Sequence, residues 1–338
     1  MTRSRSRLIS SWCVRPSQSS PKIFNGAGPL ARPFFLACYT ETVRRLIVNA
    51  DDLGMTAGIN RAIVEGCDKG VITSSTLMAT SGAFDDAVSR VVDLKFRRPQ
   101  FGVGCHVVLL DGEPILPPQH VSTLLDPTRT SERAQLRPSL NDFARAALTE
   151  KLAPKEIEAE AAAQIERIQS TGVTLSHFDC HKHAHIFPAV LRPLLRAAKG
   201  RGIHAVRNPF GKLLPLPLGR MLQLPKLWTR LAQMSVLNTF AASFRREVQK
   251  LGLRTPDGSV GVLATGWLDQ DLFSCIAESL PEGTWEFVCH PGYNDADLDQ
   301  VRTRLRQSRE QELAVLTSPE TKAVLRRRGI ELISYHEL

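Results

Sequence analysis

Short apolar segments alternate with longer amphipathic ones from residue 44 to the end of the chain. The short segments are rich in β-branched residues and have the length of strands, whereas the longer ones repeat apolar residues at helical spacing. Alternating strands and helices favour a parallel sheet covered by helices, and this number of units predicts a (β/α) barrel-like α/β fold with seven or eight mostly parallel strands. The predicted strands are 44–50, 71–80, 101–110, 174–179, 202–207, 260–264, 284–290 and 330–334, and the predicted helices are 57–69, 83–95, 154–170, 188–199, 268–280 and about 307–328.

Three segments fall outside this alternation. Residues 1–43 are rich in Arg and Ser without a clear period, and we expect a disordered N-terminal extension, with a targeting peptide as the alternative. The domain that follows, 44–338, contains two expected insertions. Residues 111–150 begin rich in proline and indicate a loop or lid. Residues 210–250 combine leucines with basic residues, which indicates either a helical excursion packed on the barrel or a contact with a membrane surface.

Composition narrows the class of protein. The chain has 338 residues, 43% apolar and 23% charged, as in ordinary globular proteins. Its net charge is +9, but six basic residues and no acid lie within residues 1–40, and no basic patch with interleaved aromatics argues for a nucleic acid partner. Seven scattered cysteines without a CxxC pair indicate neither disulfides nor a cysteine zinc site, so a cytoplasmic location is expected. No apolar run is long enough to span a membrane.

Polar side chains stand at the ends of several predicted strands. In parallel α/β folds these carboxyl ends converge on one site, so their recurrence there predicts an active site and therefore an enzyme. The side chains are Asp51 and Asp52 after the first strand, His106 late in the third, His181 after the fourth, Arg207 at the end of the fifth and His290 at the end of the seventh.

A histidine cluster occupies residues 177–185, which hold four of the nine histidines in the chain. On an extended strand, side chains two residues apart point to the same face. We therefore expect one wall lined by His177, Asp179, His181, His183 and His185. A histidine-rich turn with satisfied hydrogen bonds is the alternative.

Two imidazoles and one carboxylate form a ligand set for a divalent metal ion. Asp52, His106 and His181 provide such a set, which leaves coordination positions open for water and substrate. Nitrogen-rich ligation favours Zn²⁺-like metals. The alternatives are that Asp52 belongs to a turn and that His106 is a histidine of the core.

The neighbouring groups suit acid–base chemistry. Asp51 adjoins a ligand and is the candidate base, while His290 is the candidate acid because histidine titrates near neutral pH. Arg207 is expected either to orient the base, to hold a substrate oxygen or to serve as a structural ion-pair partner. The other cluster members, His177, Asp179, His183 and His185, are expected to bind substrate or to orient the ligands.

Several segments together resemble the YdjC-like carbohydrate deacetylases, a family that includes the chitooligosaccharide deacetylases. They are residues 46–54, 70–78, 103–109 and 177–188, and the resemblance extends over about 44–338. Residues 110–118 and 312–319 resemble the branch associated with hopanoid biosynthesis. One departure is Lys182, which stands where the family often has a histidine.

This resemblance implies a metal-dependent deacetylase on a barrel-like fold, often dimeric, that also uses Mg²⁺. It implies the same ligands, Asp52, His106 and His181, with Asp51 as base and His290 as acid. We therefore expect removal of an N-acetyl group from an amino sugar or a glycosylated lipid, the latter at the inner membrane surface. The alternatives are metal-dependent hydrolysis of other amides or of phosphoesters, and a noncatalytic protein that binds sugar or lipid. A homodimer and peripheral membrane contact are further expectations.

Overall fold

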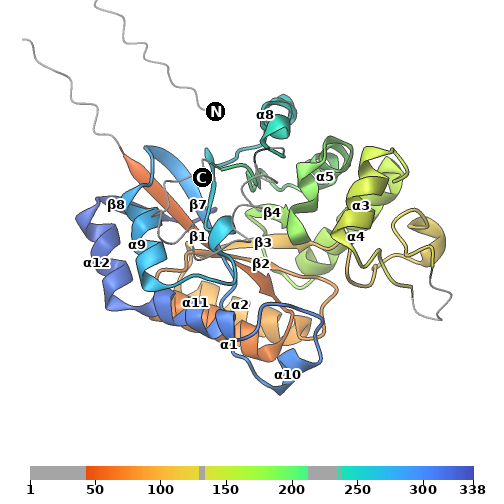
Figure 1. Ribbon diagram of the computed structural model, residues 1–338. Helices are drawn as coiled ribbons and strands as arrows, with labels where there is room; N and C mark the ends of the chain where they lie inside the picture. Colours follow the sequence, from red (N-terminus) through yellow and green to blue (C-terminus); the bar gives the residue numbers. More distant parts are fainter. Residues whose placement is uncertain (1–42, 129–133, 212–234, 236) are drawn as a thin grey trace, which may run out of the picture. The chain divides into compact units, whose positions relative to one another are not determined.

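The computed structural model describes residues 43–128, 134–211, 235 and 237–338 (Figure 1). Eight parallel strands form one sheet in the order β5-β4-β3-β2-β1-β7-β6, and β8 pairs with the first residues of β1. Backbone bonds from Val206 to Arg254 and from Ser259 to Phe210 curl the sheet toward a barrel. The predicted fold class is thus confirmed. The strands are β1 (Arg44–Leu53), β2 (Ser74–Leu77), β3 (Gly102–Val107), β4 (His177–Cys180), β5 (Ala205–Val206), β6 (Gly258–Val260), β7 (Gly283–Cys289) and β8 (Ile330–Ile333).

Helices pack outside the sheet, as Figure 1 shows for α1, α2, α11 and α12. The bounds of α1, α2, α4, α5 and α9 agree with the predicted helices to within a few residues, and α11 and α12 divide the predicted segment 307–328. No bounds were predicted for α3, α8 and α10. The helices are α1 (Ala57–Asp68), α2 (Phe84–Arg97), α3 (Leu140–Leu148), α4 (Pro154–Gln169), α5 (Pro188–Gly200), α8 (Ala241–Lys250), α9 (Gln270–Glu278), α10 (Ala296–Asp299), α11 (Gln307–Thr317) and α12 (Pro319–Arg327). Short 3₁₀ turns are η1 (Pro118–His120), η2 (His181–Ile186), η3 (Asn238–Phe240) and η4 (Val262–Ala264).

The central strand β1 shows how the sequence separates core from site. Leu46 and Val48 belong to the large apolar core, whereas Ile47 belongs to a separate small cluster with Tyr335. Because side chains alternate along a strand, Asp51 falls on the same face as Ile47. The barrel interior is therefore filled by this small apolar cluster at one end and lined by polar side chains at the other.

Local structure differs from the predictions in three places. Residues 51–53 continue β1, whereas the predicted first strand ended at residue 50 and a turn was the alternative for Asp52. The predicted strand 260–264 ends at Val260, after which Gly261 adopts a left-handed φ of 87° and η4 begins. Predicted strands such as 71–80 are longer than the observed ones, because an apolar run marks burial and not the extent of the hydrogen-bonded ladder.

Glu160 of α4 is a buried acid in a helix whose several glutamates are typical of a solvated face. Its side chain is fully buried and accepts hydrogen bonds from the backbone N–H of Ile115 (2.8 Å) and Leu116 (3.0 Å). Glu156 likewise accepts from Thr123 N. Both acids accept hydrogen bonds from the backbone of the neighbouring insertion, a partner that helical periodicity does not reveal.

The insertion at 111–150 contains η1, α3 and an isolated antiparallel bridge between Leu125 and Leu136. Most of the expected insertion at 210–250 and nearly all of the expected extension at 1–43 lie outside the described residues. Within the described part of the chain, no helix is long and apolar enough to cross a membrane.

Candidate metal-dependent active site

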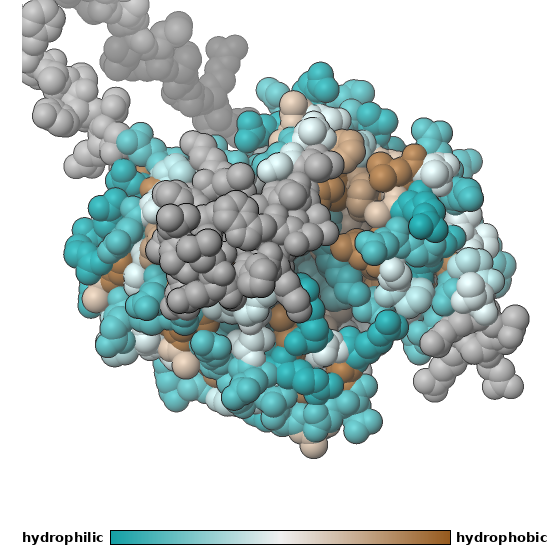
Figure 2. Space-filling model, in the orientation of Figure 1, coloured by the Kyte–Doolittle hydropathy of each residue, from teal (hydrophilic) through white to brown (hydrophobic). Residues whose placement is uncertain are grey.

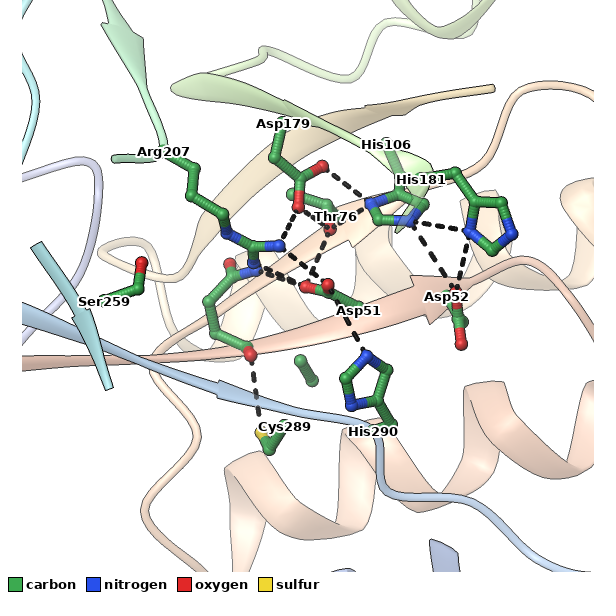
Figure 3. Close-up of polar contacts among 12 residues, drawn as sticks. Asp51, Asp52, Thr76, His106, Asp179, His181, Arg207, Ser259, Cys289 and His290 are labelled. Carbon is green, nitrogen blue, oxygen red and sulfur yellow. Dashed lines mark hydrogen bonds and ion pairs between the residues drawn. The ribbon is translucent and has the colours of Figure 1, made fainter. Parts of the chain in front are cut away.

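The strand ends bring the predicted polar residues together at one end of the barrel (Figure 3). Asp51 and Asp52 come from the end of β1, His106 from β3, and His290 directly follows β7. His181 begins η2 immediately after β4. All five side chains lie within ion-pair distance of another member of the group, because His106 and His181 face Asp52, and His290 faces Asp51.

Three ligand atoms converge as a metal site requires. His106 Nε2 lies 3.3 Å from His181 Nδ1. Asp52 Oδ1 lies 3.7 Å from the first nitrogen and 3.8 Å from the second. Two atoms that each bind one ion at about 2.1 Å must lie within about 4.2 Å of each other, and all three pairs meet this condition. The donor set therefore fits a divalent ion and leaves room on the cavity side.

His106 is held in the tautomer that metal binding requires. Its Nδ1 donates to Asp179 Oδ1 at 2.7 Å, which leaves the lone pair of Nε2 directed toward Asp52 and His181. This carboxylate–histidine arrangement orients ligands at many metal sites. Burial lowers the pKa of His106, but the surrounding carboxylates outweigh burial and raise it to about 9 in the metal-free protein, so a bound ion would displace the proton of Nε2 while Nδ1 keeps its own. Burial lowers the pKa of His181 to about 4, so this ligand is neutral at physiological pH.

Arg309 of α11 is a site residue that sequence reasoning missed. It is buried, and its Nη2 donates to Asp52 Oδ2 at 2.6 Å, so that Oδ1 remains free for the histidines. Burial raises the pKa of Asp52, yet the guanidinium of Arg309 holds it well below its usual range. Asp52 also has a left-handed φ of 68°, which is rare for a non-glycine residue. No sequence signal distinguishes Arg309 from the neighbouring arginines of its segment.

Arg207 binds the carboxylate of Asp51. Both carboxylate oxygens accept from the guanidinium, Oδ2 at 2.7 Å and Oδ1 at 2.5 Å. Arg207 also contacts Asp179 at 2.5 Å and Glu286 at 2.8 Å, and it is fully buried. Burial raises the pKa of Asp51, but Arg207 outweighs it and keeps the carboxylate ionised. Asp51, Asp179 and His106 form a second group with metal-ligand geometry, but both of its carboxylates are already paired with Arg207.

Thr76 and His290 complete the group. Thr76, which sequence reasoning missed, contacts Asp51 Oδ1 at 3.4 Å, His106 Nδ1 at 3.2 Å and Asp179 Oδ2 at 3.3 Å. His290 Nε2 lies 3.8 Å from Asp51 Oδ2, and its backbone N–H donates to Glu312 at 2.6 Å. His290 Nδ1 is buried without a hydrogen-bond partner among the described residues.

The histidine cluster does not form the predicted wall. The strand β4 ends at Cys180, and Lys182 and His183 adopt left-handed φ angles of 52° and 54°, so side chains no longer alternate. His177 stacks on Tyr335 inside the barrel with ring centroids 3.7 Å apart. His185 is fully buried beside Phe244.

Burial separates the cluster into supporting and accessible groups. His177, Asp179, His185 and Arg207 are all fully buried, and none of them lines the cavity beside the site. His183 does line it, and burial lowers its pKa to about 3, so its imidazole is neutral. Of the residues expected to bind substrate or to orient ligands, only His183 is placed to contact a substrate.

A cavity of about 1040 Å³ opens over the site (Figure 2). The candidate ligands and both acid–base candidates line its floor, together with His183 and Lys182. Figure 2 shows hydrophobic residues along the upper edge of the hollow and hydrophilic ones below it. Apolar lining residues include Leu140, Phe187 and Phe210. This volume slightly exceeds the upper end of typical small-molecule pockets, about 1,000 Å³.

Comparison with known proteins identifies the family of the chain. A model of the family described as YdjC-like protein matches residues 45–327. The chain belongs to the YdjC-like family. The predicted family is thereby confirmed, whereas the hopanoid-associated branch stays a prediction.

Similar proteins cover nearly the whole domain. A carbohydrate deacetylase of Geobacillus stearothermophilus is 32% identical, over 87% of this chain and 98% of its own length. One of Brevibacillus brevis is 31% identical, over 87% and 99%. A crystal structure of a candidate cellobiose-phosphate cleavage protein of Enterococcus faecalis superposes with a TM-score of 0.65 at 24% identity, over 87% of this chain and 98% of that one, which supports the fold.

Proposed function

We propose that this protein is a metal-dependent hydrolase that removes an N-acetyl group from an amino sugar. The observation that carries the proposal is the convergence of Asp52, His106 and His181 on one point of the cavity floor, with Asp51 and His290 beside it. The names of the related carbohydrate deacetylases support the reaction and the class of substrate.

The charges of the buried network support a divalent ion. Four buried carboxylates are joined by ion pairs to only two buried guanidinium groups. In the metal-free site the raised pKa of His106 lets this ring carry one further positive charge, and once a bound ion has displaced that proton two negative charges are left. Uncompensated buried charge is strongly unfavourable, so a doubly charged cation would restore the balance. The carboxylates are those of Asp51, Asp52, Asp179 and Glu286, and the guanidinium groups those of Arg207 and Arg309.

The three ligands would hold an ion whose Lewis acidity polarises a carbonyl oxygen and lowers the pKa of water. Asp51, kept ionised by Arg207, takes the proton from the attacking water, whose oxygen bonds to the acetyl carbonyl carbon. Protonated His290 gives its proton to the amine nitrogen as the C–N bond breaks, and acetate and the free amine leave. Two ions are candidates for this site. The two imidazoles favour Zn²⁺, and the family resemblance implies Mg²⁺.

Acetate release and metal content test the proposal together. In Asp52→Asn, His106→Ala and His181→Ala we expect loss of both acetate release and bound metal from a folded protein. His204→Ala, which removes an exposed histidine distant from the cavity, should retain both. Acetate release at the wild-type rate in all three ligand variants would contradict the proposal. Release of phosphate from phosphoesters instead of acetate, or sugar binding without any hydrolysis, would favour the alternatives.

A glycosylated lipid is the second candidate substrate, because Leu140, Phe187 and Phe210 give the cavity an apolar side next to its polar floor. The resemblance of residues 110–118 to the hopanoid-associated branch favours the same substrate class. Comparing kcat/KM for N-acetylglucosamine and for its long-chain alkyl glycoside tests this candidate. The expected membrane contact, cytoplasmic location and homodimer stay predictions, to be tested by vesicle co-sedimentation, cell fractionation and light scattering.

A further inference from the structure

Left-handed backbone is concentrated around the cavity. Among the described residues, five non-glycine residues have a positive φ, namely Asp52, Asp111, Glu150, Lys182 and His183. All of them except Glu150 line the cavity. Such conformations are unfavourable and persist where the surrounding structure requires them, often at functional sites. Asp52 and His183 have places in the site already described, but Asp111 and Lys182 do not.

Asp111 and Lys182 form an ion pair on the cavity wall. The Lys182 Nζ donates to Asp111 Oδ2, and the two side chains keep 33% and 18% of their surface exposed respectively. Lys182 directly follows the candidate ligand His181, so the pair borders the point where the acetyl group would react. Both side chains are fixed but remain accessible from the cavity.

The turn that carries Asp111 is anchored on both sides by α4. The Gln164 side chain bonds the backbone N–H and C=O of Val108, at 2.8 and 2.7 Å. Glu160 accepts from the N–H groups of Ile115 and Leu116 beyond the turn. These anchors are fully buried, so the turn is rigid and Asp111 is held in place before any ligand arrives.

We propose that Asp111 and Lys182 form a subsite for two neighbouring hydroxyls of the sugar that bears the acetamido group. After the ion pair is made, Asp111 retains an accepting oxygen and the Lys182 ammonium retains two N–H donors. A vicinal diol offers the complement, because each hydroxyl both donates and accepts. The subsite therefore selects sugars over other N-acetyl compounds, and it rests on the proposed deacetylase function.

Two variants test the subsite. Asp111→Asn removes the carboxylate charge, and Lys182→Asn removes the ammonium while asparagine tolerates the left-handed backbone. The matched control is Asp142→Asn, which breaks the 2.8 Å ion pair with Arg137 in the same insertion but outside the cavity. Thermal midpoints and metal content establish that each variant is folded and loaded.

The readouts are binding of an N-acetylated disaccharide by calorimetry, and kcat and KM for this sugar and for 4-nitrophenyl acetate, which lacks hydroxyls. Loss of hydrogen bonds to a charged group predicts that each cavity variant binds the sugar about 10- to 100-fold more weakly, through KM. The ratio of kcat/KM for the sugar to kcat/KM for the ester should fall by the same factor as sugar binding. The control variant should match wild type in both measurements. Unchanged sugar binding, or equal losses for sugar and ester together with lower thermal midpoints, would overturn the subsite. Wild-type protein that binds the sugar without releasing acetate would refute the deacetylase function but not the subsite.

Discussion

Asp179 links the candidate metal site to the buried ion pairs, so replacing it tests how the site is built. Its carboxylate accepts from His106 Nδ1 at 2.7 Å and contacts Arg207 Nη1 at 2.5 Å. In Asp179→Asn, one amide oxygen cannot serve both donors. Either the amide N–H₂ faces the Arg207 cation, or it faces His106 and forces the tautomer whose Nε2 carries the proton and cannot bind metal.

The size of the effect follows from these contacts. Loss of a group that orients a metal-binding histidine typically weakens metal binding about 10- to 100-fold, or about 1.4–2.7 kcal/mol. Arg207 retains its ion pairs with Asp51 and Glu286 in this variant. The free energy of unfolding should therefore fall by less than the roughly 3–5 kcal/mol of a fully broken buried ion pair. The variant should therefore fold but bind metal weakly.

The assay is calorimetric titration of chelator-treated protein with Zn²⁺ and, separately, with Mg²⁺. Glu286→Gln is the matched control, since it also removes one carboxylate from Arg207 but does not contact His106. We expect Asp179→Asn to lose at least tenfold in affinity and Glu286→Gln to lose far less. Affinity within twofold of wild type in Asp179→Asn, or equal losses in both variants, would refute the role assigned to the His106 tautomer.

Two further predictions concern stability. Burial lowers the pKa of His181 to about 4 and of His183 to about 3, so between about pH 6.5 and 5 only the unfolded chain takes up these protons. The raised pKa of His106 has the opposite effect, mainly above pH 6.5. The urea midpoint of the metal-free protein should therefore fall from pH 6.5 to 5, and fall less in His183→Gln; a pH-independent midpoint would argue against neutral buried histidines. Glu160→Ala should lower stability by about 1–3 kcal/mol, because the N–H groups of Ile115 and Leu116 lose their acceptor. Glu158→Ala, at a partly exposed position of the same helix, should change it by less than about 1 kcal/mol; similar urea curves for the two variants would count against the role of Glu160 in holding the insertion.

The alternation of strands and helices, and the polar residues at strand ends, were predictable because both follow from local periodicity. Asp51 and His106 point into the barrel by the same two-residue repeat that places apolar neighbours in the core. This repeat holds only while the ladder continues, and nothing in the sequence marks its end at Cys180 before the left-handed residues of η2.

Long-range partners were not predictable in the same way. Arg309 lies 257 residues from Asp52 and looks like any other basic residue of a helix. Glu160 sits in an acidic helix and differs from its exposed neighbours only through the loop that packs over it. Contacts of this kind depend on tertiary packing, which the local pattern of one sequence does not reveal.

The central claim is that one divalent ion, held by Asp52, His106 and His181, is required to release acetate from an N-acetylated sugar. The most direct measurement is acetate release from chelator-treated protein as Zn²⁺ or Mg²⁺ is added back, with the bound metal counted at each point. We predict no release without metal and a rise in proportion to occupancy that ends at one ion per chain. Full acetate release by metal-free protein, or activity unrelated to occupancy of this site, would contradict the account.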